Sequence, residues 1–531
     1  MHGALGAGRL FVLARAAVLG VAALLLCRDL GGAFDTWHAV NDALQTQAAR
    51  NHLRHGLGAT RLYTTYPGVA GEPPQRYLNH PPLVAVLTAV PLAVFGDHEW
   101  AARLMPILAT LGSTWLLATM LGRLGTPLLG LLAGFFFATL PATQYFGRMV
   151  NHEAPVEFFS LLMLHGYLQW TSAYGSRYSA RGGALAWAVG TVFGIATGWA
   201  ALLMAGVLWC WQLLRTVRRT AGGRPLAWLT LVPALTLGAV VLHLLAGSGW
   251  DLGMLPNLLR ARSLAGEGGQ QGWRAWLGWQ SAYFVRNFTW PGAIAALLCA
   301  PLVVLGLLRR GDPHRGRWRA LGAGPSAVAA ACGVQGLLWV VLLKNQSWFH
   351  DYWQFHLGPY VALGLAGLVL MTWRLVGRWA PRLAALVATV LVTAPMPFAA
   401  AARDFYASQR LVDPEFLAAL QALSRLVPAG APTCTSHRLH EGGETRGGHA
   451  ERWPHPVIAY YADRPLFYSR DLAEIRGREP GCSAYVLKRA DQPWSRAIAA
   501  GLSSAPSVDV GGHHVIFLLS PSSPPSRAAG R

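Results

Sequence analysis

The chain has 531 residues, of which 53% are hydrophobic and only 13% are charged, and its mean hydropathy is +0.33. A soluble domain usually carries about 25% charged residues, so this composition excludes an ordinary soluble protein. The formal net charge of +20 does not indicate nucleic acid as a partner, because the basic residues form short clusters between apolar runs. We therefore predict a mainly α protein, a polytopic transmembrane helical bundle.

The basic clusters orient the apolar runs, because loops rich in arginine stay on the cytoplasmic side. The densest clusters begin at Arg215, Arg309 and Arg374. The first apolar run has no convincing signal-peptide cleavage site, so we expect it to remain as a span. About eleven spans result, with the N-terminus inside and the C-terminus outside. They are 9–27, 100–122, 126–146, 154–172, a hairpin of two spans within 184–214, 226–246, 291–308, 324–343, 357–373 and 383–402.

The transmembrane domain therefore covers residues 1–402, and its longest external loop is 28–99. Within this loop, Pro82–Phe95 is apolar but only about 14 residues long, so we expect an interfacial helix rather than a span. A helical pattern over 41–54 carries Asp42 and Arg50 on the same general face. If Pro82–Phe95 crossed the membrane instead, the polar segments on its two sides would face opposite compartments.

Residues 403–520 are more polar, and we predict a small extracytoplasmic α/β domain there. The segment starting at Asp413 predicts a helix that Gly430 closes. Cys434 and Cys482 lie in this domain, where a disulfide can form, whereas the other four cysteines fall in apolar runs. Short β-type runs lie at 457–461, 484–487 and 513–519, a helical patch lies at 471–476, and residues 521–531 form a tail expected to be disordered.

The first external loop supplies two carboxylates and a histidine that could carry chemistry. Asp42 and Asp35 lie beside apolar segments, where a carboxylate has a raised proton affinity and suits a general base; the alternatives are a helix cap and a loop acid. His80 follows Asn79 and precedes Pro81-Pro82, which fix the backbone, so it can donate hydrogen bonds to a phosphate. Its structural alternative is a turn histidine without a ligand.

Two later polar segments complete the candidate site. Arg148 and Glu153 flank Asn151 at the outer ends of two spans, and a planar guanidinium suits a phosphate clamp. A structural ion pair between Arg148 and Glu153 is the alternative. The third segment offers four side chains: Lys344, His350, Asp351 and Tyr352. Lys344 is a further candidate for phosphate binding, or a snorkelling lysine at the membrane interface.

At these residues the chain resembles the GT-C glycosyltransferases, specifically the bacterial relatives of protein O-mannosyltransferases and of the aminoarabinose transferase that acts on lipid A. The resemblance covers about residues 1–400. The matching segments occur in the family's order: Ala49-Arg50-Asn51 with Gly56, His80-Pro81-Pro82-Leu83, Glu99-Trp100-Ala101-Ala102-Arg103-Leu104, Arg148 to Glu153 with Pro155, and His350-Asp351-Tyr352.

The resemblance implies an integral-membrane glycosyltransferase of the bacterial plasma membrane with its active site outside the cytoplasm. Its donor would be a polyprenyl-phosphate-linked sugar, its acceptor a lipid, glycan or protein, and transfer would usually invert the anomeric carbon. His80 and Arg148 would bind the donor phosphate, and a first-loop acid would be the base. The family's adjacent Asp-Glu pair reads Asn41-Asp42 here, and the second-loop acid is Glu153 where Asp is commoner.

Two other interpretations follow from the same residues. A transporter or flippase for lipid-linked sugars would place its ionisable groups near the midplane, whereas here they gather at one face. The altered Asn41-Asp42 pair is compatible with an inactive relative that only binds. Some relatives use a divalent metal and others do not, and Asp351 or Glu153 could be its ligands. The sequence does not identify the sugar or the acceptor.

Overall fold

The computed structural model describes residues 2–519, apart from 66–75, 175–177, 219–221, 264–271, 309–323, 411, 429–430, 437–455, 464–465, 478–480 and 491. The chain divides into two compact units, which are described separately. The bundle unit comprises Met1–Gly31, Leu78–Pro91 and Trp100–Tyr406, and the sheet unit comprises Gly32–Tyr77, Leu92–Glu99 and Ala407–Arg531. The expected basic cluster at 309–319, Gly430 and the tail 521–531 lie outside the described residues.

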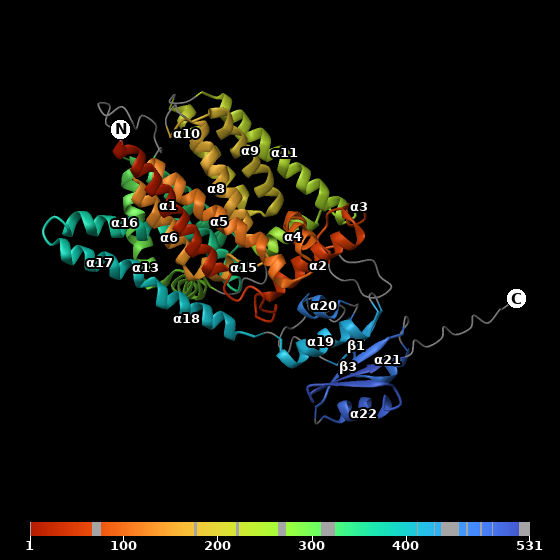
Figure 1. The fold of residues 1–531 in the computed structure, drawn as a ribbon. Coiled ribbons are helices and arrows are strands. Elements are labelled where there is room, and N and C mark those ends of the chain that lie inside the picture. Colours follow the sequence, from red (N-terminus) through yellow and green to blue (C-terminus); the bar gives the residue numbers. More distant parts are fainter. Residues whose placement is uncertain are drawn as a thin grey trace. The chain divides into compact units, whose positions relative to one another are not determined.

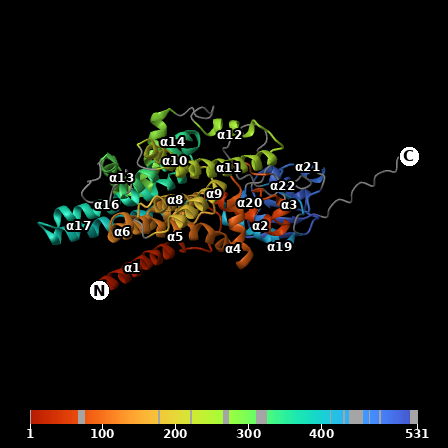
Figure 2. The same ribbon diagram turned by 90° about the horizontal axis from the view of Figure 1, so that it is seen from above.

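The regular elements in the described part of the bundle unit are helices (Figure 1). Helix α1 packs against α6 at the edge of the bundle (Figure 2). The elements are α1 (His2–Leu26), α4 (Leu83–Phe95), α5 (Glu99–Leu124), α6 (Pro127–Thr139), α7 (Pro141–Phe146), α8 (Glu153–Trp170), α9 (Ala180–Thr197), α10 (Ala200–Val217), α11 (Arg224–Gly247), α12 (Met254–Arg262), α13 (Trp273–Leu308), α14 (Pro325–Leu342), α15 (Lys344–Ser347), the 3-10 helix η2 (Asp351–Leu357), α16 (Gly358–Val376), α17 (Pro381–Thr393) and α18 (Pro395–Ser408).

Seven helical segments of the described chain are long and apolar enough to cross a membrane. They coincide with the predicted spans at 100–122, the second half of 184–214, 226–246, 291–308, 324–343, 357–373 and 383–402. The other four predicted spans are helical but do not meet these criteria in full. In the predicted span 126–146 the cause is Pro141, because the residue before a proline avoids the helical region and Leu140 is extended there. The segment Leu83–Phe95 is a short apolar helix, in agreement with the prediction.

Helices α8 and α9 pack with their backbones in close approach, and they lie side by side in Figure 1. Glycines make this approach feasible at several levels. A Cβ added to Gly166 would lie 2.2 Å from the backbone nitrogen of Trp187, and one added to Gly183 would lie 2.4 Å from that of Trp170. Small residues are the usual means of close packing between membrane helices, because lipid supplies little hydrophobic driving force for their association. The stretch 184–214 breaks at Gly198, between α9 and α10, so the two helices predicted within it are present.

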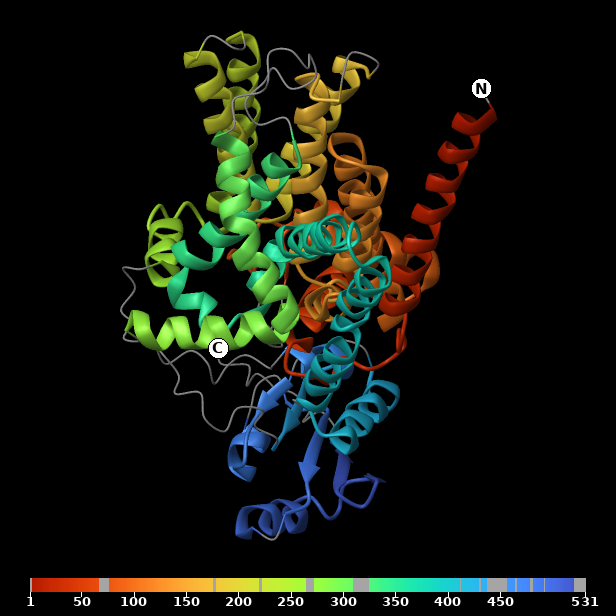
Figure 3. The ribbon, with the colours of Figure 1, turned by 90° about the vertical axis from the view of Figure 1, so that its left-hand side faces the viewer.

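Helix α13 contains a sharp bend that divides it into two straight parts (Figure 3). The bend falls at Thr289, whose backbone has φ 69° and ψ 163°, two residues before Pro291. A proline inside a helix removes a backbone hydrogen bond and disfavours the helical region just before it. The stretch 247–290, between the predicted spans 226–246 and 291–308, is helical over α12 and over the first part of α13. Only the second part of α13 coincides with the predicted span 291–308.

The sheet unit joins part of the first loop to the C-terminal residues. Its five strands follow the order β2-β1-β3-β5-β4, with β2, β1 and β3 parallel and β5 antiparallel to both β3 and β4. The elements are α2 (Ala39–His55), α3 (Leu57–Thr60), α19 (Pro414–Leu426), β1 (Thr433–Thr435), α20 (Pro456–Ala462), β2 (Leu466–Tyr468), α21 (Leu472–Gly477), β3 (Ala484–Lys488), α22 (Pro493–Gly501), β4 (Ser507–Val510) and β5 (His514–Leu518).

Several predicted elements of this unit are present, and two need correction. The strands predicted at 484–487 and 513–519 are β3 and β5, and the helical patch at 471–476 is α21. The run 457–461 is not a strand but helix α20, which begins at Pro456 and packs against α2. Helix α19 starts as predicted, with Asp413 accepting a hydrogen bond from the Glu415 amide, but it ends at Leu426 because Pro428 forces Val427 to be extended.

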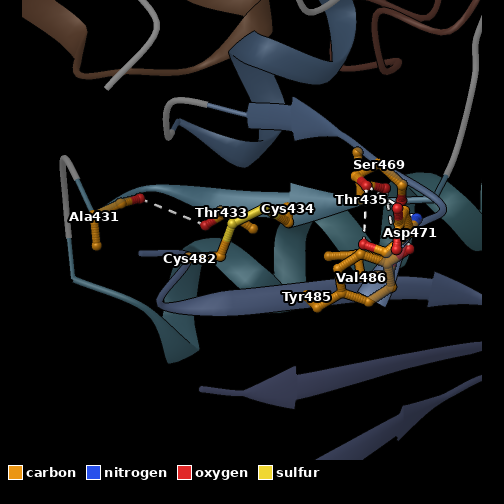
Figure 4. The surroundings of a disulfide bond; sticks show 9 residues. All are labelled: Ala431, Thr433, Cys434, Thr435, Ser469, Asp471, Cys482, Tyr485 and Val486. Atoms are coloured by element: carbon orange, nitrogen blue, oxygen red, sulfur yellow. Dashed lines mark hydrogen bonds between the residues drawn. A yellow bond between two sulfur atoms is a disulfide. The ribbon is translucent and has the colours of Figure 1, made fainter. Parts of the chain in front are cut away.

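Cys434 and Cys482 form a disulfide that links β1 to the residues preceding β3 (Figure 4). Both cysteines are buried, and they pack in the core of the sheet with Tyr485, Leu487 and Phe517. The Tyr485 hydroxyl donates a hydrogen bond of 2.7 Å to the carbonyl of Ser469. The disulfide therefore belongs to the core of this small domain, where it adds a covalent constraint to limited hydrophobic burial.

Candidate active site

The turn at His80 is fixed by its own prolines and by a tryptophan from a distant helix. Pro81 and Pro82 lead directly into α4. The Trp199 indole nitrogen donates a hydrogen bond of 3.0 Å to the carbonyl of Asn79. Trp199 holds this position because the α9–α10 break at Gly198 turns it toward the His80 segment. The side chain of His80 is thus presented from a well-anchored backbone.

His152 lies against His80. The centroids of the two imidazole rings are 4.2 Å apart and their planes differ by 30°. His152 is buried, and its Nδ1 lies 2.7 Å from the side-chain oxygen of Asn151. A Cβ on Gly198 would approach within 2.8 Å of Val156 and 3.5 Å of His152, so only glycine lets the α9–α10 break come this close. Asn151 thereby orients the ring that contacts His80.

Arg262, the last residue of α12, is the cation of this group. Its Nη1 lies 3.3 Å from Nε2 of His80. Arg262 is buried, and its Nε has no hydrogen-bond partner among the described residues. Because a guanidinium only donates, Nε2 of His80 accepts, which leaves Nδ1 of His80 carrying the hydrogen. We call His80, His152 and Arg262 the His–Arg cluster.

The His–Arg cluster carries its positive charge on the arginine alone. Burial and, to a smaller extent, the neighbouring Arg262 together lower the pKa of His152 to about 3. Burial also holds the pKa of His80 well below its ordinary value, and the electrostatic effects of the neighbouring His152, Arg262 and His350 act in the same direction. Both imidazoles are therefore neutral at physiological pH. A buried guanidinium beside two neutral rings favours binding of an anion.

Glu153 follows His152 at the start of α8. The side chain is buried, and its Oε2 has no hydrogen-bond partner in the described structure. Burial raises the pKa of Glu153 to about 8, although a hydrogen bond from its own backbone opposes this shift. The residue precedes the predicted span 154–172, so it lies at the end of the apolar segment rather than within it. Its pKa suits a group that takes up and releases a proton near neutral pH.

The third polar segment reaches the cluster through His350. His350 lies close enough to lower the pKa of His80. Lys344 is buried, with its ammonium 4.8 Å from the centre of the Trp273 ring. The next residue, Asn345, donates a hydrogen bond of 3.4 Å to the carbonyl of Ala261, which precedes Arg262. Helices α12 and α15 thus bring Lys344 into the neighbourhood of the His–Arg cluster.

Asp351 and Tyr352 have structural contacts. Asp351 Oδ2 lies 3.1 Å from Nη2 of Arg286 and accepts a hydrogen bond of 2.9 Å from the Tyr406 hydroxyl. The guanidinium of Arg286 stacks over three aromatic rings, among them Tyr406 at 5.2 Å. Tyr352 is buried, and its ring centroid lies 4.9 Å from that of His350. These contacts hold η2 against α13 and the end of α18.

Arg148 donates hydrogen bonds to main-chain carbonyl groups. Its guanidinium donates hydrogen bonds to the carbonyl oxygens of Arg28 and Asp29, which follow α1, and the bond to Asp29 is 2.9 Å long. The carbonyls at a helix C-terminus lack intrahelical donors, and an arginine is a favourable partner for them. In this structure Arg148 therefore anchors the end of α1.

The first-loop carboxylates belong to the sheet unit. Asp42 is buried in the first turn of α2, beside Asn41. Asp35 lies 3.9 Å from Nε of Arg410. Arg50, on the same helix as Asp42, forms an ion pair of 2.6 Å with Asp97 and stacks over Tyr460 at 4.2 Å. Arg50 thus joins α2 to α20 within the unit, which is a structural role.

The structure adds two residues to those predicted from sequence, His152 and Arg262. His152 lies within the predicted second polar segment, but its histidine could not be paired with His80 from sequence spacing. Arg262 lies between the predicted spans 226–246 and 291–308, in a loop rich in tryptophan and arginine, and no pattern distinguishes it from its neighbour Arg260. Among the described residues, no group of three or more His, Cys, Asp or Glu side chains is placed to hold a metal ion.

A family comparison matches the part of the chain that carries the first two polar segments of the bundle unit. Residues 79–243 match the family described as dolichyl-phosphate-mannose-protein mannosyltransferase. The match begins at Asn79 and includes His80, His152 and Glu153. No curated protein matches the chain by sequence.

Solved structures with the same fold cover nearly the whole chain. ArnT from Cupriavidus metallidurans bound to undecaprenyl phosphate has a TM-score of 0.58 and 13% identity, covering 96% of this chain and 98% of that one. The Archaeoglobus fulgidus oligosaccharyltransferase in the apo form has a TM-score of 0.54 and 12% identity, covering 92% and 68%. The chain has a GT-C fold and resembles the protein mannosyltransferase family. The family resemblance predicted from the sequence is thus confirmed.

Proposed function

We propose that this GT-C protein transfers a sugar from a polyprenyl-phosphate-linked donor to an extracytoplasmic lipid, glycan or protein, with inversion at the anomeric carbon. The observation that carries the proposal is the buried His–Arg cluster beside Glu153. Such a cluster at the ends of membrane helices suits an anionic headgroup whose apolar chain lies among the helices. ArnT from Cupriavidus metallidurans is bound to undecaprenyl phosphate, and the Archaeoglobus fulgidus oligosaccharyltransferase AglB is in complex with an inhibitory peptide and a dolichol-phosphate.

The donor phosphate would bind Arg262 and the Nδ1 hydrogen of His80, with Lys344 supplying a second cation and Arg148 a further one from the second polar segment. Breaking the bond between the sugar and the phosphate leaves negative charge on the phosphate oxygen. A fixed guanidinium stabilises that charge more as the bond breaks, and this difference is what accelerates the reaction. Asn79, Asn151 and His350 would support the cluster from its edges.

The acceptor hydroxyl needs a base. We propose Asp42 for this role because it is the buried acid of the first loop, with Asp35 and Glu153 as the other carboxylates. The base takes the hydroxyl proton, the acceptor oxygen bonds to the anomeric carbon, and the bond from this carbon to the phosphate oxygen breaks. Attack opposite the leaving phosphate inverts the configuration. Glu153, with a pKa of about 8, would hold the acceptor or exchange a proton with it.

The site and the sheet unit are placed outside the cytoplasm of a bacterial plasma membrane in this proposal. The disulfide between Cys434 and Cys482 supports the placement, because disulfides persist in oxidising compartments and are rare in the cytosol. The arginine clusters of the loops support the same orientation of the helices.

A turnover assay tests the proposal. The purified protein, reconstituted in liposomes, is supplied with lipid-linked sugars extracted from a bacterial envelope, and released polyprenyl phosphate is measured by mass spectrometry. Release by the wild type and its loss in Arg262→Ala are the expected results. Movement of the intact lipid-linked sugar across the bilayer, without release, would contradict the proposal and identify a carrier.

A further inference from the structure

About one turn after the start of α8 lies a buried acid–base pair, Glu157 and His356, that the proposed reaction does not use. Nδ1 of His356 lies 2.8 Å from Oε2 of Glu157. The side chains are 2% and 0% exposed, so neither reaches solvent. Whether the shared proton resides on the carboxylate or on the ring, the pair is neutral overall. Ionisable groups this deep in an apolar bundle are costly, and they are retained mainly where they have a role.

The position of the pair relates it to the site. Glu157 lies four residues after Glu153, so both project from the same face of α8. His356 lies near the end of η2, the segment that follows His350. The hydrogen bond therefore connects the helix that begins with Glu153 to the segment that carries His350.

The local structure of η2 makes this connection important. Seven residues of 3-10 helix is long for this conformation, whose hydrogen bonds have poorer geometry than those of an α-helix. Side chains of α13 hold its earlier part: Asn287 donates to the Asp351 carbonyl at 2.9 Å, and Gln354 donates to Gln280. His356 holds its later part against α8.

We infer that the Glu157–His356 pair is a positioning device that fixes Glu153 relative to His350 and the His–Arg cluster. This inference rests on the proposed function, because Glu153 and His350 matter only if they meet substrate there. Glu157 and His356 are positioning residues rather than catalytic ones. A displacement of about 1 Å in reacting groups can reduce a rate by about a hundredfold.

The decisive variant replaces both partners, Glu157→Met together with His356→Leu. Removing one partner alone leaves a buried polar group and can unfold the protein, whereas replacing a whole buried pair by apolar side chains is often neutral or stabilising. We expect the double variant to keep the melting temperature of the wild type, while kcat falls about ten- to a hundredfold and the KM for the donor changes less.

Two single variants serve as controls. Glu157→Gln retains an oxygen that accepts a hydrogen bond from Nδ1 of His356, so this variant should keep most of the wild-type activity that the double variant loses. Gln335→Leu removes another buried link in the bundle, because Gln335 Nε2 donates to Ser160 Oγ at 2.9 Å and to the Ala200 carbonyl, and neither acceptor belongs to η2. This control should lower the melting temperature and leave kcat per folded molecule unchanged.

Backbone hydrogen exchange separates this inference from the proposed function. In the double variant, peptides covering 345–357 should exchange faster than in the wild type, and those of Gln335→Leu should not. This result supports positioning even if the wild type proves to transfer no sugar. An unchanged exchange rate in 345–357, or a double variant with the kcat of the wild type, would overturn the inference.

Discussion

The guanidinium of Arg262 lies 3.3 Å from Nε2 of His80, although the two residues are far apart in the sequence. His80 lies at the start of the region 79–243 that matches the family, and Arg262 lies beyond its end. His152 packs against His80, with its ring centroid 4.2 Å from that of His80. The Arg262 guanidinium is thus the permanent positive charge of the cluster, whereas the neutral rings of His80 and His152 contribute hydrogen bonds but no charge. The predictions below follow from this asymmetry and from the contacts around it.

Replacement of Arg262 by alanine should weaken donor binding by about ten- to a hundredfold, because hydrogen bonds to charged groups contribute roughly 1.5–3 kcal/mol. The measurement is the dissociation constant of polyprenyl phosphate for the purified protein. Arg260→Ala is the matched control, since Arg260 lies in the same last turn of α12 but is exposed. Equal losses in the two variants would show that general positive charge, and not this contact, binds the lipid.

Transfer should speed up as the pH rises from about 6 to about 9, with a midpoint near the pKa of Glu153, about 8. The reason is that ionised Glu153 is the form that accepts a proton. Glu153→Gln should lower kcat/KM and remove this limb of the pH profile. An unchanged limb in the variant would assign it to another group.

The same residue predicts how stability depends on pH. The pKa of Glu153 is raised in the folded state from its ordinary 4.5 to about 8, so between these values the folded state binds more protons than the unfolded state. The free energy of unfolding should therefore decrease as the pH rises from about 4.5 to about 8. Thermal unfolding of the wild type and Glu153→Gln across this range should show the decrease in the wild type and a smaller one in the variant.

The two first-loop acids should respond differently to neutralisation. Asp42→Asn should lower transfer by more than about a hundredfold if Asp42 is the base. Asp35→Asn should lower it by less than about tenfold, or roughly 1.4 kcal/mol, because Asp35 faces Arg410 and its role is then structural. Steady-state kinetics of both variants makes the comparison, and losses in the reverse order would make Asp35 the base.

Tyr406→Phe should reduce the free energy of unfolding by about 1 kcal/mol without changing kcat. The hydroxyl of Tyr406 donates to Asp351 at 2.9 Å and lies 2.8 Å from the side-chain oxygen of Asn287, and none of these groups is proposed to contact substrate. The melting temperature in detergent and the turnover of the folded fraction give the two quantities. A large loss of kcat would instead place Asp351 in the reaction.

Loss of the disulfide in Cys434→Ser should destabilise the sheet unit by about 2–4 kcal/mol, because the bridge closes a long loop of the unfolded chain. The assay is thermal unfolding of the full chain, followed by intrinsic fluorescence. Cys332→Ala provides a comparison in which a buried cysteine of the bundle is lost and the disulfide remains. The bridge itself can be detected by mass spectrometry before and after reduction.

The sequence alone determined the class of the molecule. Long apolar runs exclude all but helices in a bilayer, because the backbone must satisfy its own hydrogen bonds there, and the start of α19 followed from its Asp-Pro-Glu signal. His80, Glu153 and His350 could be identified because histidine and glutamate at the ends of apolar runs are costly without a role. The family resemblance rested on short motifs in a fixed order, and such motifs can be recognised in the sequence without a structure.

Only the tertiary structure decided which partners these residues have. Arg262 and His152 meet His80 through the α9–α10 break and through α12, and such contacts depend on packing between helices rather than on sequence spacing. The contacts of Asp351 with Tyr406, and of Arg148 with the carbonyls that follow α1, could likewise not be predicted from sequence. The run 457–461 has β-forming side chains but is a helix, since its packing against α2 outweighs a local preference of about 1 kcal/mol or less.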